Sequence, residues 1–283
     1  YLYIYMNKFV KLIFFLMALI IIFVSFFTFK RRNNKKLYKI TNKDKVSVII
    51  LNYKRPHNLK KLIPELLTYP LIDDIIVSNG LKGKEFELFN KRVKIINDFK
   101  IDKLYGAAIR FLKIKHVKND IVLFIDDDII PSEDLVNKLY FNVKNNYNRN
   151  TIYGPFARIC CSKGISPLYV QIYNFIKDIF NIEYDSWSYN SILTPILMCK
   201  ASIIHDYLQS DEGWIKYKEW FKKYKGNCED LSLNKFIESY YNEMPERVNG
   251  KFRSLDWFNG YSSTKLLEFR KIRSDFCRKY SIK

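Results

Sequence analysis

Residues 121–136 read IVLFIDDDIIPSEDLV, and this stretch decides which fold the sequence specifies. The β-branched, apolar run at 121–125 predicts a buried strand that ends at the three aspartates 126–128. Pro131 and Ser132 then open a predicted helix with two acids in its first turn, where the helix dipole favours them. The stretch therefore predicts a strand, an acidic loop and a helix in succession.

The same order recurs on either side of this stretch. Residues 46–51, VSVIIL, predict a strand that ends at the loop NYKRP, 52–56, before a helix-period segment at 58–67. Further strands are predicted at 72–77 and 93–96, and a further helix at 104–117. Strands that alternate with helices indicate a mostly parallel, doubly wound α/β sheet, whose ligands bind beyond the carboxyl ends of its strands. Lys54, Arg55 and the three aspartates lie at those ends.

The composition excludes several classes of protein. The chain has 283 residues, of which 48% are hydrophobic, so it is not a disordered polymer. Its five cysteines are too few for a disulfide-built scaffold and include no Cys-x-x-Cys pair for zinc. Residues 1–45 carry ten Lys or Arg against one acid, Asp44, so they hold about half of the net charge of +19. With no recognition motif present, we expect no nucleic-acid partner.

A membrane anchor is predicted near the amino terminus. Residues 12–29 contain no charged side chain, and a helix of 18 residues spans about 27 Å, close to the thickness of a bilayer core. We expect a short tail at 1–11, a retained anchor at 12–29 and a basic stem at 30–45. The orientation stays open, because the basic flank after residue 29 favours the cytosol whereas a type II anchor places the following domain in the lumen.

The acidic triplet has two interpretations. In extended backbone alternate residues share a face, so Asp126 and Asp128 can point together into a crevice while Asp127 points elsewhere. This arrangement suits a hard divalent cation such as Mn²⁺ or Mg²⁺. The alternative is an acidic turn between strand and helix, with Asp128 as a local cap. The three histidines are isolated and form no ligand pattern: His57, His116 and His205.

A second acidic group precedes another predicted helix. Asn227-Cys228-Glu229-Asp230 leads into residues 231–241, where apolar side chains recur at helical spacing. Asn227 as an N-cap, with acids in the first turn, is sufficient to explain this group structurally. The carboxyl-terminal cations form either a solvated face or a phosphate clamp: Arg270, Lys271, Arg273, Arg278 and Lys279.

Five segments taken in order resemble one enzyme family. They are 46–56, 122–136, 153–155 (YGP), 226–236 (GNCEDLSLNKF) and 259–262 (NGYS). In this order they are similar to the exostosin-type glycosyltransferases of family 64, which have the GT-A fold, a Rossmann-like nucleotide-diphospho-sugar transferase architecture. The resemblance covers most of residues 46–280. It implies a nucleotide-sugar-binding half at 46–155 and an acceptor and catalytic half at 156–283.

The resemblance implies a donor site on the first half. The donor would be a UDP-sugar, a uridine diphosphate N-acetylhexosamine, held with Mn²⁺ or Mg²⁺. Asp128 would ligate the metal with Asp126, and Asp126 and Asp127 would hold metal-bound water or ribose. Arg55 would meet the diphosphate, and Arg110 matches a family arginine that faces the donor.

The resemblance also implies a catalytic site on the second half. Asp230 would be the catalytic carboxylate, and Arg273 would bind the diphosphate, with Arg270 as a competing match. Cys228 and Cys277 match a pair that is bridged in the family, which implies an oxidising lumen and a type II Golgi or endoplasmic reticulum protein. The other cysteines, Cys160, Cys161 and Cys199, are expected to be buried thiols.

The implied reaction moves a sugar to a glycan or glycoconjugate acceptor with retention of configuration. Two other classes stay open: an inverting transferase with Asp230 or Glu229 as general base, and a membrane-anchored binding protein without activity. A partner transferase or a homodimer is possible by analogy with the family. Ser263 replaces the glycine usual after NGYS, and residues 161–189 match nothing in the family.

Overall fold

The computed structural model describes residues 40–41, 43–53, 55–80, 87–158, 160–161, 164–165, 190–255 and 266–280. Residues 40–283 form one compact unit. The predicted tail, the anchor at 12–29 and the stem up to residue 39 lie outside the described residues. Within the described ranges, no helix combines the length and apolarity that a membrane span requires.

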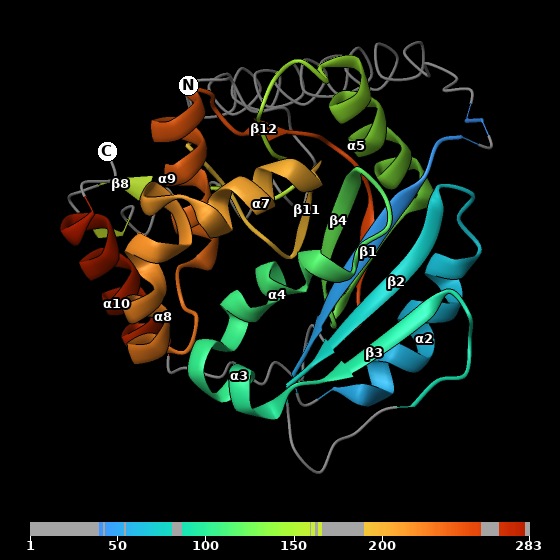
Figure 1. Cartoon of the computed structure of the whole chain (residues 1–283), viewed down its shortest axis with the longest axis horizontal. Coiled ribbons are helices and arrows are strands. Elements are labelled where there is room, and N and C mark those ends of the chain that lie inside the picture. Colours follow the sequence, from blue (N-terminus) through green and yellow to red (C-terminus); the bar gives the residue numbers. More distant parts are fainter. Residues whose placement is uncertain are drawn as a thin grey trace, which may run out of the picture. The chain divides into compact units, whose positions relative to one another are not determined.

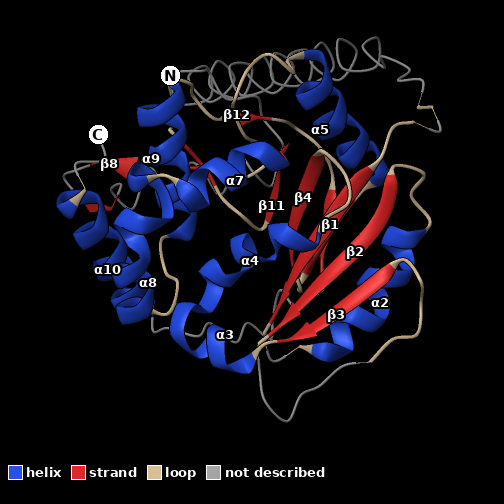
Figure 2. Ribbon diagram, viewed as in Figure 1, coloured by secondary structure: helices blue, strands red, loops and turns tan. Residues whose placement is uncertain are grey.

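The unit is built on a mixed sheet of seven strands, which Figures 1 and 2 show. In spatial order the strands are β12 (Glu246–Arg247), β6 (Tyr153–Gly154), β11 (Ile196–Lys200), β4 (Ile121–Asp126), β1 (Val46–Asn52), β2 (Ile72–Asn79) and β3 (Val93–Asn97). Strands β3, β2, β1 and β4 are mutually parallel, whereas β11 runs antiparallel to both of its neighbours. The predicted parallel-dominated α/β sheet is confirmed.

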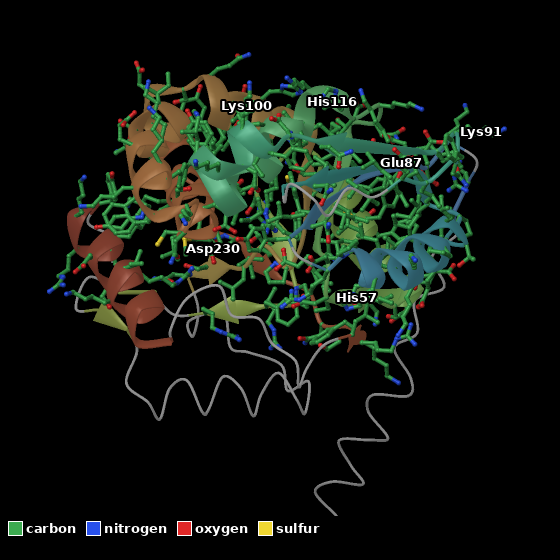
Figure 3. All side chains as sticks on the ribbon, turned by 90° about the horizontal axis from the view of Figure 1, so that it is seen from below. His57, Glu87, Lys91, Lys100, His116 and Asp230 are labelled. Atoms are coloured by element: carbon green, nitrogen blue, oxygen red, sulfur yellow. The ribbon has the colours of Figure 1, made fainter. Side chains whose placement is uncertain are left out.

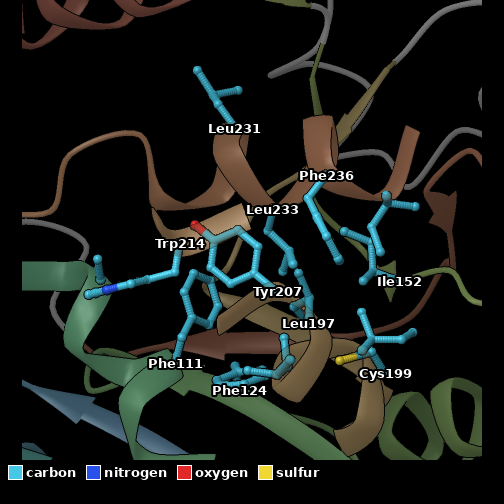
Figure 4. Close-up of a cluster of buried hydrophobic side chains, with 14 of the residues drawn as sticks. Phe111, Phe124, Ile152, Leu197, Cys199, Tyr207, Trp214, Leu231, Leu233 and Phe236 are labelled. Carbon is cyan, nitrogen blue, oxygen red and sulfur yellow. The ribbon is translucent and has the colours of Figure 1, made fainter. Parts of the chain in front are cut away.

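Period-two alternation sends the strand side chains into two cores. Val48 and Ile50 of β1 join one cluster, and Ile49 joins the other. The first cluster lies under the helices α2 (Pro56–Leu67) and α5 (Glu133–Asn145). The second lies under α4 (Ile109–Leu112), α7 (Ala201–Gln209) and α9 (Glu229–Tyr241). Figure 4 shows its centre, where Phe111 meets Phe124 and Tyr207 edge to face, with ring centroids 5.5 and 5.4 Å apart.

The helix predicted at 104–117 is wrong as a single element. The chain forms α3 (Phe99–Tyr105), a 3-10 turn (Gly106–Ala108), α4 and a second 3-10 turn (Lys113–His116). Gly106 has φ 47°, and a Cβ built there would lie 1.9 Å from the carbonyl oxygen of Lys225. The close approach of a distant loop therefore interrupts the apolar period, which the local pattern does not reveal.

The described part of the carboxyl-terminal half is mainly helical. It contains α7, a π turn (Asp211–Ile215), α8 (Lys216–Tyr224), α9 and α10 (Leu266–Lys279). Three small antiparallel pairs complete the described part of the fold: β5 (Ile129–Pro131) with β13 (Phe252–Ser254), β7 (Ala157–Arg158) with β10 (Ser191–Ile192), and β8 (Cys160–Cys161) with β9 (Gly164–Ile165).

The predicted helix starts have different outcomes. Ser132 caps α5 as expected, since its hydroxyl accepts a hydrogen bond from the Leu135 amide at 3.2 Å. The cap predicted at Asn227 is wrong. Cys228 stands at the N-cap of α9 with φ 74° and makes no side-chain cap. The left-handed backbone of the preceding turn moves Asn227 away from the capping position.

The predicted disulfide between Cys228 and Cys277 is not present. Both residues are thiols, they are buried in the same apolar cluster, and the described part of the chain contains no disulfide. Cys199 is a buried thiol, as predicted, and burial raises the pKa of its thiol. The side chains of Cys160 and Cys161 lie outside the description.

Candidate functional site

The candidate site lies where the parallel strands end. In Figure 1 the arrowheads of β1, β2 and β3 converge on one edge of the sheet. Leu51, near the end of β1, pairs in register with Asp126, the last residue of β4. The register therefore places the acidic triplet beside the loop that follows β1, as the predicted topology requires.

An asparagine ladder crosses the same edge and was not predicted. Asn52 Nδ2 donates to Asn79 Oδ1 at 2.7 Å, and Asn79 Nδ2 donates to Asn97 Oδ1 at 2.7 Å. Each asparagine is the last residue of its strand. That shared position is the sequence signal that could have identified the ladder.

The exposure of the three aspartate side chains alternates along the triplet, as predicted for extended backbone. Asp127 is buried, whereas the side chains of Asp126 and Asp128 are 30% and 35% exposed. Asp127 accepts hydrogen bonds from the Tyr53 amide at 2.8 Å and from Arg55 Nη1 at 2.9 Å. Burial raises the pKa of Asp127 to about 7, although these two donors oppose the increase. Asp127 thus anchors the loop after β1, and Asp126 and Asp128 are the accessible pair.

Arg55 lies directly against the triplet. Its Nη1 atom is 2.9 Å from Asp127 Oδ1 and 3.0 Å from Asp128 Oδ2. The guanidinium, with a side chain 14% exposed, therefore joins the buried aspartate to an accessible one. A cation in this place can meet a ligand phosphate without leaving the triplet.

Arg110 is the most deeply buried cation of the site. Its Nη2 atom is 2.7 Å from Asp126 Oδ1 and 3.9 Å from Glu229 Oε1. Its Nη1 atom donates to the Thr194 carbonyl at 3.1 Å, and its Nε atom donates to the Ala107 carbonyl at 3.2 Å. Arg110 thereby links the end of β4 to the start of α9, which no sequence spacing shows.

Glu229 is part of this network. The Thr194 hydroxyl donates to Glu229 Oε1 at 2.8 Å. Burial and the neighbouring Asp230 raise the pKa of Glu229 to about 7, while Arg110 and Thr194 oppose the increase. The sequence suggested Glu229 only as an alternative base, and Thr194 carried no recognisable signal at all.

Asp230 and Arg273 form a two-pronged ion pair. Arg273 Nη1 and Nη2 donate to Asp230 Oδ1 and Oδ2 at 3.0 and 2.9 Å, and the Leu231 amide donates to Oδ1 at 2.8 Å. Figure 3 shows Asp230 on the side of the domain where α10 lies. The structure therefore brings together these two predicted catalytic residues. The competing Arg270 has its side chain outside the description, and Lys271 is exposed.

Side chains of the types that ligate metals are dispersed in the described part of the chain. The described residues contain no group of three or more His, Cys, Asp or Glu side chains placed to hold a metal ion. His57, His116 and Asp230 lie on three different parts of the domain in Figure 3. Asp126 and Asp128 are partly exposed carboxylates at the carboxyl ends of the strands, each beside an arginine.

The chain matches a known protein family over most of its length. The family model described as the glycosyl transferase family 64 domain matches residues 46–264, about three-quarters of the chain. No curated protein was found to match. The matched range includes the acidic triplet, Arg110 and Asp230, and it ends before Arg273. The chain therefore belongs to glycosyl transferase family 64 and carries a glycosyltransferase domain.

Proposed function

We propose that the chain transfers an N-acetylhexosamine from a UDP-sugar to a hydroxyl of a glycan or glycoconjugate, with retention and with a divalent metal ion. One observation carries the proposal. Asp126, one of the accessible pair, is connected through Arg110 to Glu229, the direct neighbour of Asp230. An accessible carboxylate that could hold a metal ion and an oriented carboxylate thus lie within one charge network.

The accessible carboxylates fit a metal that is completed by its substrate. Mn²⁺ and Mg²⁺ typically take one or two protein carboxylates and draw further ligands from substrate phosphates. Asp128 and Asp126 would hold the ion. The ion would neutralise negative charge on the departing diphosphate.

The protein's own charges match the charge that the reaction develops. The bond from the anomeric carbon to the diphosphate breaks, a bond to the acceptor oxygen forms, and the acceptor proton passes to the diphosphate. Arg55, next to Asp128, would bind the negatively charged leaving group. Asp230, held by Arg273 and the Leu231 amide, would stabilise positive charge on the sugar from a fixed position.

An inverting reaction is the second candidate, and one observation favours it. Glu229 has a pKa raised to about 7, which is suitable for a general base near neutral pH. Its carboxylate, however, already accepts a hydrogen bond from Thr194 and lies beside Arg110. The anomeric configuration of the product, read by NMR, separates the two reactions.

We also propose that residues 12–29 anchor the chain in a membrane of the Golgi or endoplasmic reticulum, with the domain in the lumen. The uncharged run of 18 residues supports the anchor. Because Cys228 and Cys277 form no disulfide with each other, they do not support a position in the oxidising lumen. The family resemblance alone supports this orientation. A partner transferase or a second copy of the chain remains part of the proposal on the same basis.

Donor binding tests the proposed function. The full chain in detergent is titrated with UDP-N-acetylglucosamine and UDP-N-acetylgalactosamine by calorimetry, with Mn²⁺ and with chelator. We expect binding that requires the metal and is lost in Asp128→Asn. The control Asp134→Asn changes an exposed aspartate of α5 that pairs only with Lys138 among the described contacts, and it should bind like the wild type. Binding that survives both the chelator and Asp128→Asn would contradict the metal site.

A further inference from the structure

We infer that Thr194 is a positioning residue for glycosyl transfer, which fixes Glu229 and Arg110 so that Asp126 and Asp230 keep their separation. The inference rests on the proposed function, which assigns Asp126 to the donor side and Asp230 to the reacting carbon. Thr194 is buried in the turn between β10 and β11, and neither the sequence patterns nor the family resemblance selects it.

Thr194 makes one contact to each half of the site. Its hydroxyl donates to Glu229 Oε1 at 2.8 Å, at the start of α9. Its carbonyl accepts from Arg110 Nη1 at 3.1 Å, on α4. The closest printed approach between Arg110 and Glu229 is 3.9 Å, too long for a hydrogen bond. Thr194 is therefore the hydrogen-bonded link between these two side chains.

The rest of the turn continues the same connection. The Pro195 carbonyl accepts from the Asp126 amide at 3.1 Å, which ties the turn to the end of β4. The Ile192 amide donates to Asn234 Oδ1 at 2.8 Å, and Asn234 Nδ2 donates back to the Ile192 carbonyl at 2.8 Å and to the Asp230 carbonyl at 2.7 Å. Residues 192–195 thus bridge the metal-side carboxylate and the helix that carries the catalytic one.

The Thr194 hydroxyl determines whether Arg110 pairs with Asp126 or with Glu229. Several groups face Glu229: Asp230 on its own helix, Arg110 on α4, Arg273 on α10, Thr194 in the turn and Tyr207 on α7. With the Thr194 hydroxyl present, Arg110 stays on Asp126 at 2.7 Å. Without that hydroxyl, the buried Glu229 carboxylate lacks its short donor and competes with Asp126 for the same guanidinium. The accessible pair Asp126 and Asp128 then loses its alignment with Asp230.

The variant Thr194→Val isolates this hydroxyl, because valine keeps the shape and the backbone carbonyl that holds Arg110. Thr194→Ser restores the hydroxyl without the methyl group. Thr151→Val is the matched control, since Thr151 is equally buried and its hydroxyl donates to the Met244 carbonyl at 2.6 Å. All three are compared for thermal stability, kcat and KM of the UDP-sugar.

We expect Thr194→Val to lower kcat by about 10- to 100-fold, at a temperature where it is fully folded, with KM of the UDP-sugar changed less than about threefold. Thr194→Ser should return to within about threefold of the wild type, and Thr151→Val should lose stability without losing kcat. An unchanged kcat in Thr194→Val, or an equal loss in Thr151→Val, would overturn the inference.

A crystal structure of Thr194→Val gives a readout that does not depend on the donor. We expect Glu229 to move toward Arg110 and the contact from Arg110 to Asp126 to lengthen. If the wild type neither binds nor turns over UDP-N-acetylhexosamines, the proposed donor is wrong, and the positions of these side chains still decide the role of Thr194. Unmoved Glu229 and Arg110 side chains would refute that role.

Discussion

Arg273 on α10 holds both carboxylate oxygens of Asp230 on α9, with hydrogen bonds of 3.0 and 2.9 Å. The two side chains are only 17% and 6% exposed, so the pair lies largely out of water. A planar guanidinium that binds both oxygens fixes the rotation of the carboxylate as well as its place. The last described helix of the chain therefore orients the residue to which we assign the central role in the reaction.

Arg273→Lys tests whether Asp230 must be oriented by a planar guanidinium or needs only a positive charge beside it. Lysine keeps the positive charge but offers a point contact in place of the planar fork, so Asp230 gains rotational freedom. If Arg273 acts on Asp230 and not on the diphosphate, kcat should fall by about 10- to 100-fold while metal-dependent donor binding changes little, whereas an equal loss of donor binding would favour the diphosphate contact that the family resemblance implies. The control Arg278→Lys alters a side chain of the same helix that pairs with Asp275 at the surface, and steady-state kinetics should not distinguish it from the wild type.

Arg110→Gln should destabilise the domain in a pH-dependent way. Its loss removes the cation that lies against Asp126 and the buried Glu229, which costs about 3–5 kcal/mol of unfolding free energy. Burial and Asp230 already raise the pKa of Glu229 above its unfolded value, so Glu229 reduces stability as pH rises through that pKa. Removing Arg110 raises this pKa further and therefore increases the deficit at high pH.

Denaturant unfolding at pH 5 and pH 8 checks the effect of Arg110→Gln. We expect a larger deficit from the wild type at pH 8 than at pH 5. Arg149→Gln is the control, because Arg149 pairs with Glu243 and Glu246 at a site where its side chain is 34% exposed. It should show a small deficit that is nearly equal at the two pH values. A pH-independent deficit in Arg110→Gln would mean that Glu229 does not titrate as described.

The sequence predicted the elements whose signals are local. The apolar runs of β1 and β4 identify the central strands, and the alternation of the triplet separates Asp127 from its two neighbours. The carboxyl-end rule then places Arg55 beside the triplet, as observed. These features depend on the period of a few consecutive residues and on a general property of parallel sheets, so no tertiary information is needed.

Features that depend on distant contacts could not be predicted. Thr194 bonds to Glu229 across 35 residues and to Arg110 across 84 residues, and nothing in the local pattern marks it. The break in the helix predicted at 104–117 arises where Gly106 meets the Lys225 carbonyl. The same turn displaces Asn227 from the N-cap of α9. In each case a close packing of two loops overrides a local preference.

Asp102→Asn should change how stability depends on pH. Asp102 is 8% exposed, and burial raises the pKa of its carboxyl to about 6, although Lys113 opposes the increase. The folded state therefore holds a proton between about pH 4 and pH 6 that the unfolded state has released, so this group removes stability as pH rises through that window. Above pH 6 the buried Asp102 carboxylate therefore lowers the free energy of unfolding by roughly 2–3 kcal/mol.

Because asparagine carries no charge, Asp102→Asn should gain stability relative to the wild type as pH rises. Urea unfolding at pH 4 and pH 7 measures the difference. Asp134→Asn is the control, since Asp134 is an exposed aspartate that pairs with Lys138 and is not among the charges that act on Asp102. The control should not become more stable at pH 7 than at pH 4, relative to the wild type. Parallel pH profiles for Asp102→Asn and the wild type would contradict the burial of a titrating carboxyl.

Two substitutions in the turn before α9 should act in opposite directions. Lys225 and Gly226 both have left-handed backbone, with φ of 49° and 75°, directly before the helix that carries Glu229 and Asp230. A Cβ at Gly226 would lie 2.1 Å from the Tyr105 carbonyl oxygen and 2.5 Å from the Ala107 and Ala108 amides. Gly226→Ala must therefore move one of the two loops, and we expect a loss of at least about 2 kcal/mol.

Lys225→Gly instead relieves a left-handed residue at the end of α8, where glycine is the preferred residue, and should raise the unfolding free energy by up to about 1 kcal/mol. Calorimetric melting of both variants measures the two effects. Because the loop at Gly226 contacts the segment that leads into α4, Gly226→Ala should also lower kcat by disturbing Arg110, whereas Lys225→Gly should leave kcat unchanged. If Gly226→Ala melted like the wild type, the close approach of the two loops would be wrong, and with it the explanation for the break between α3 and α4.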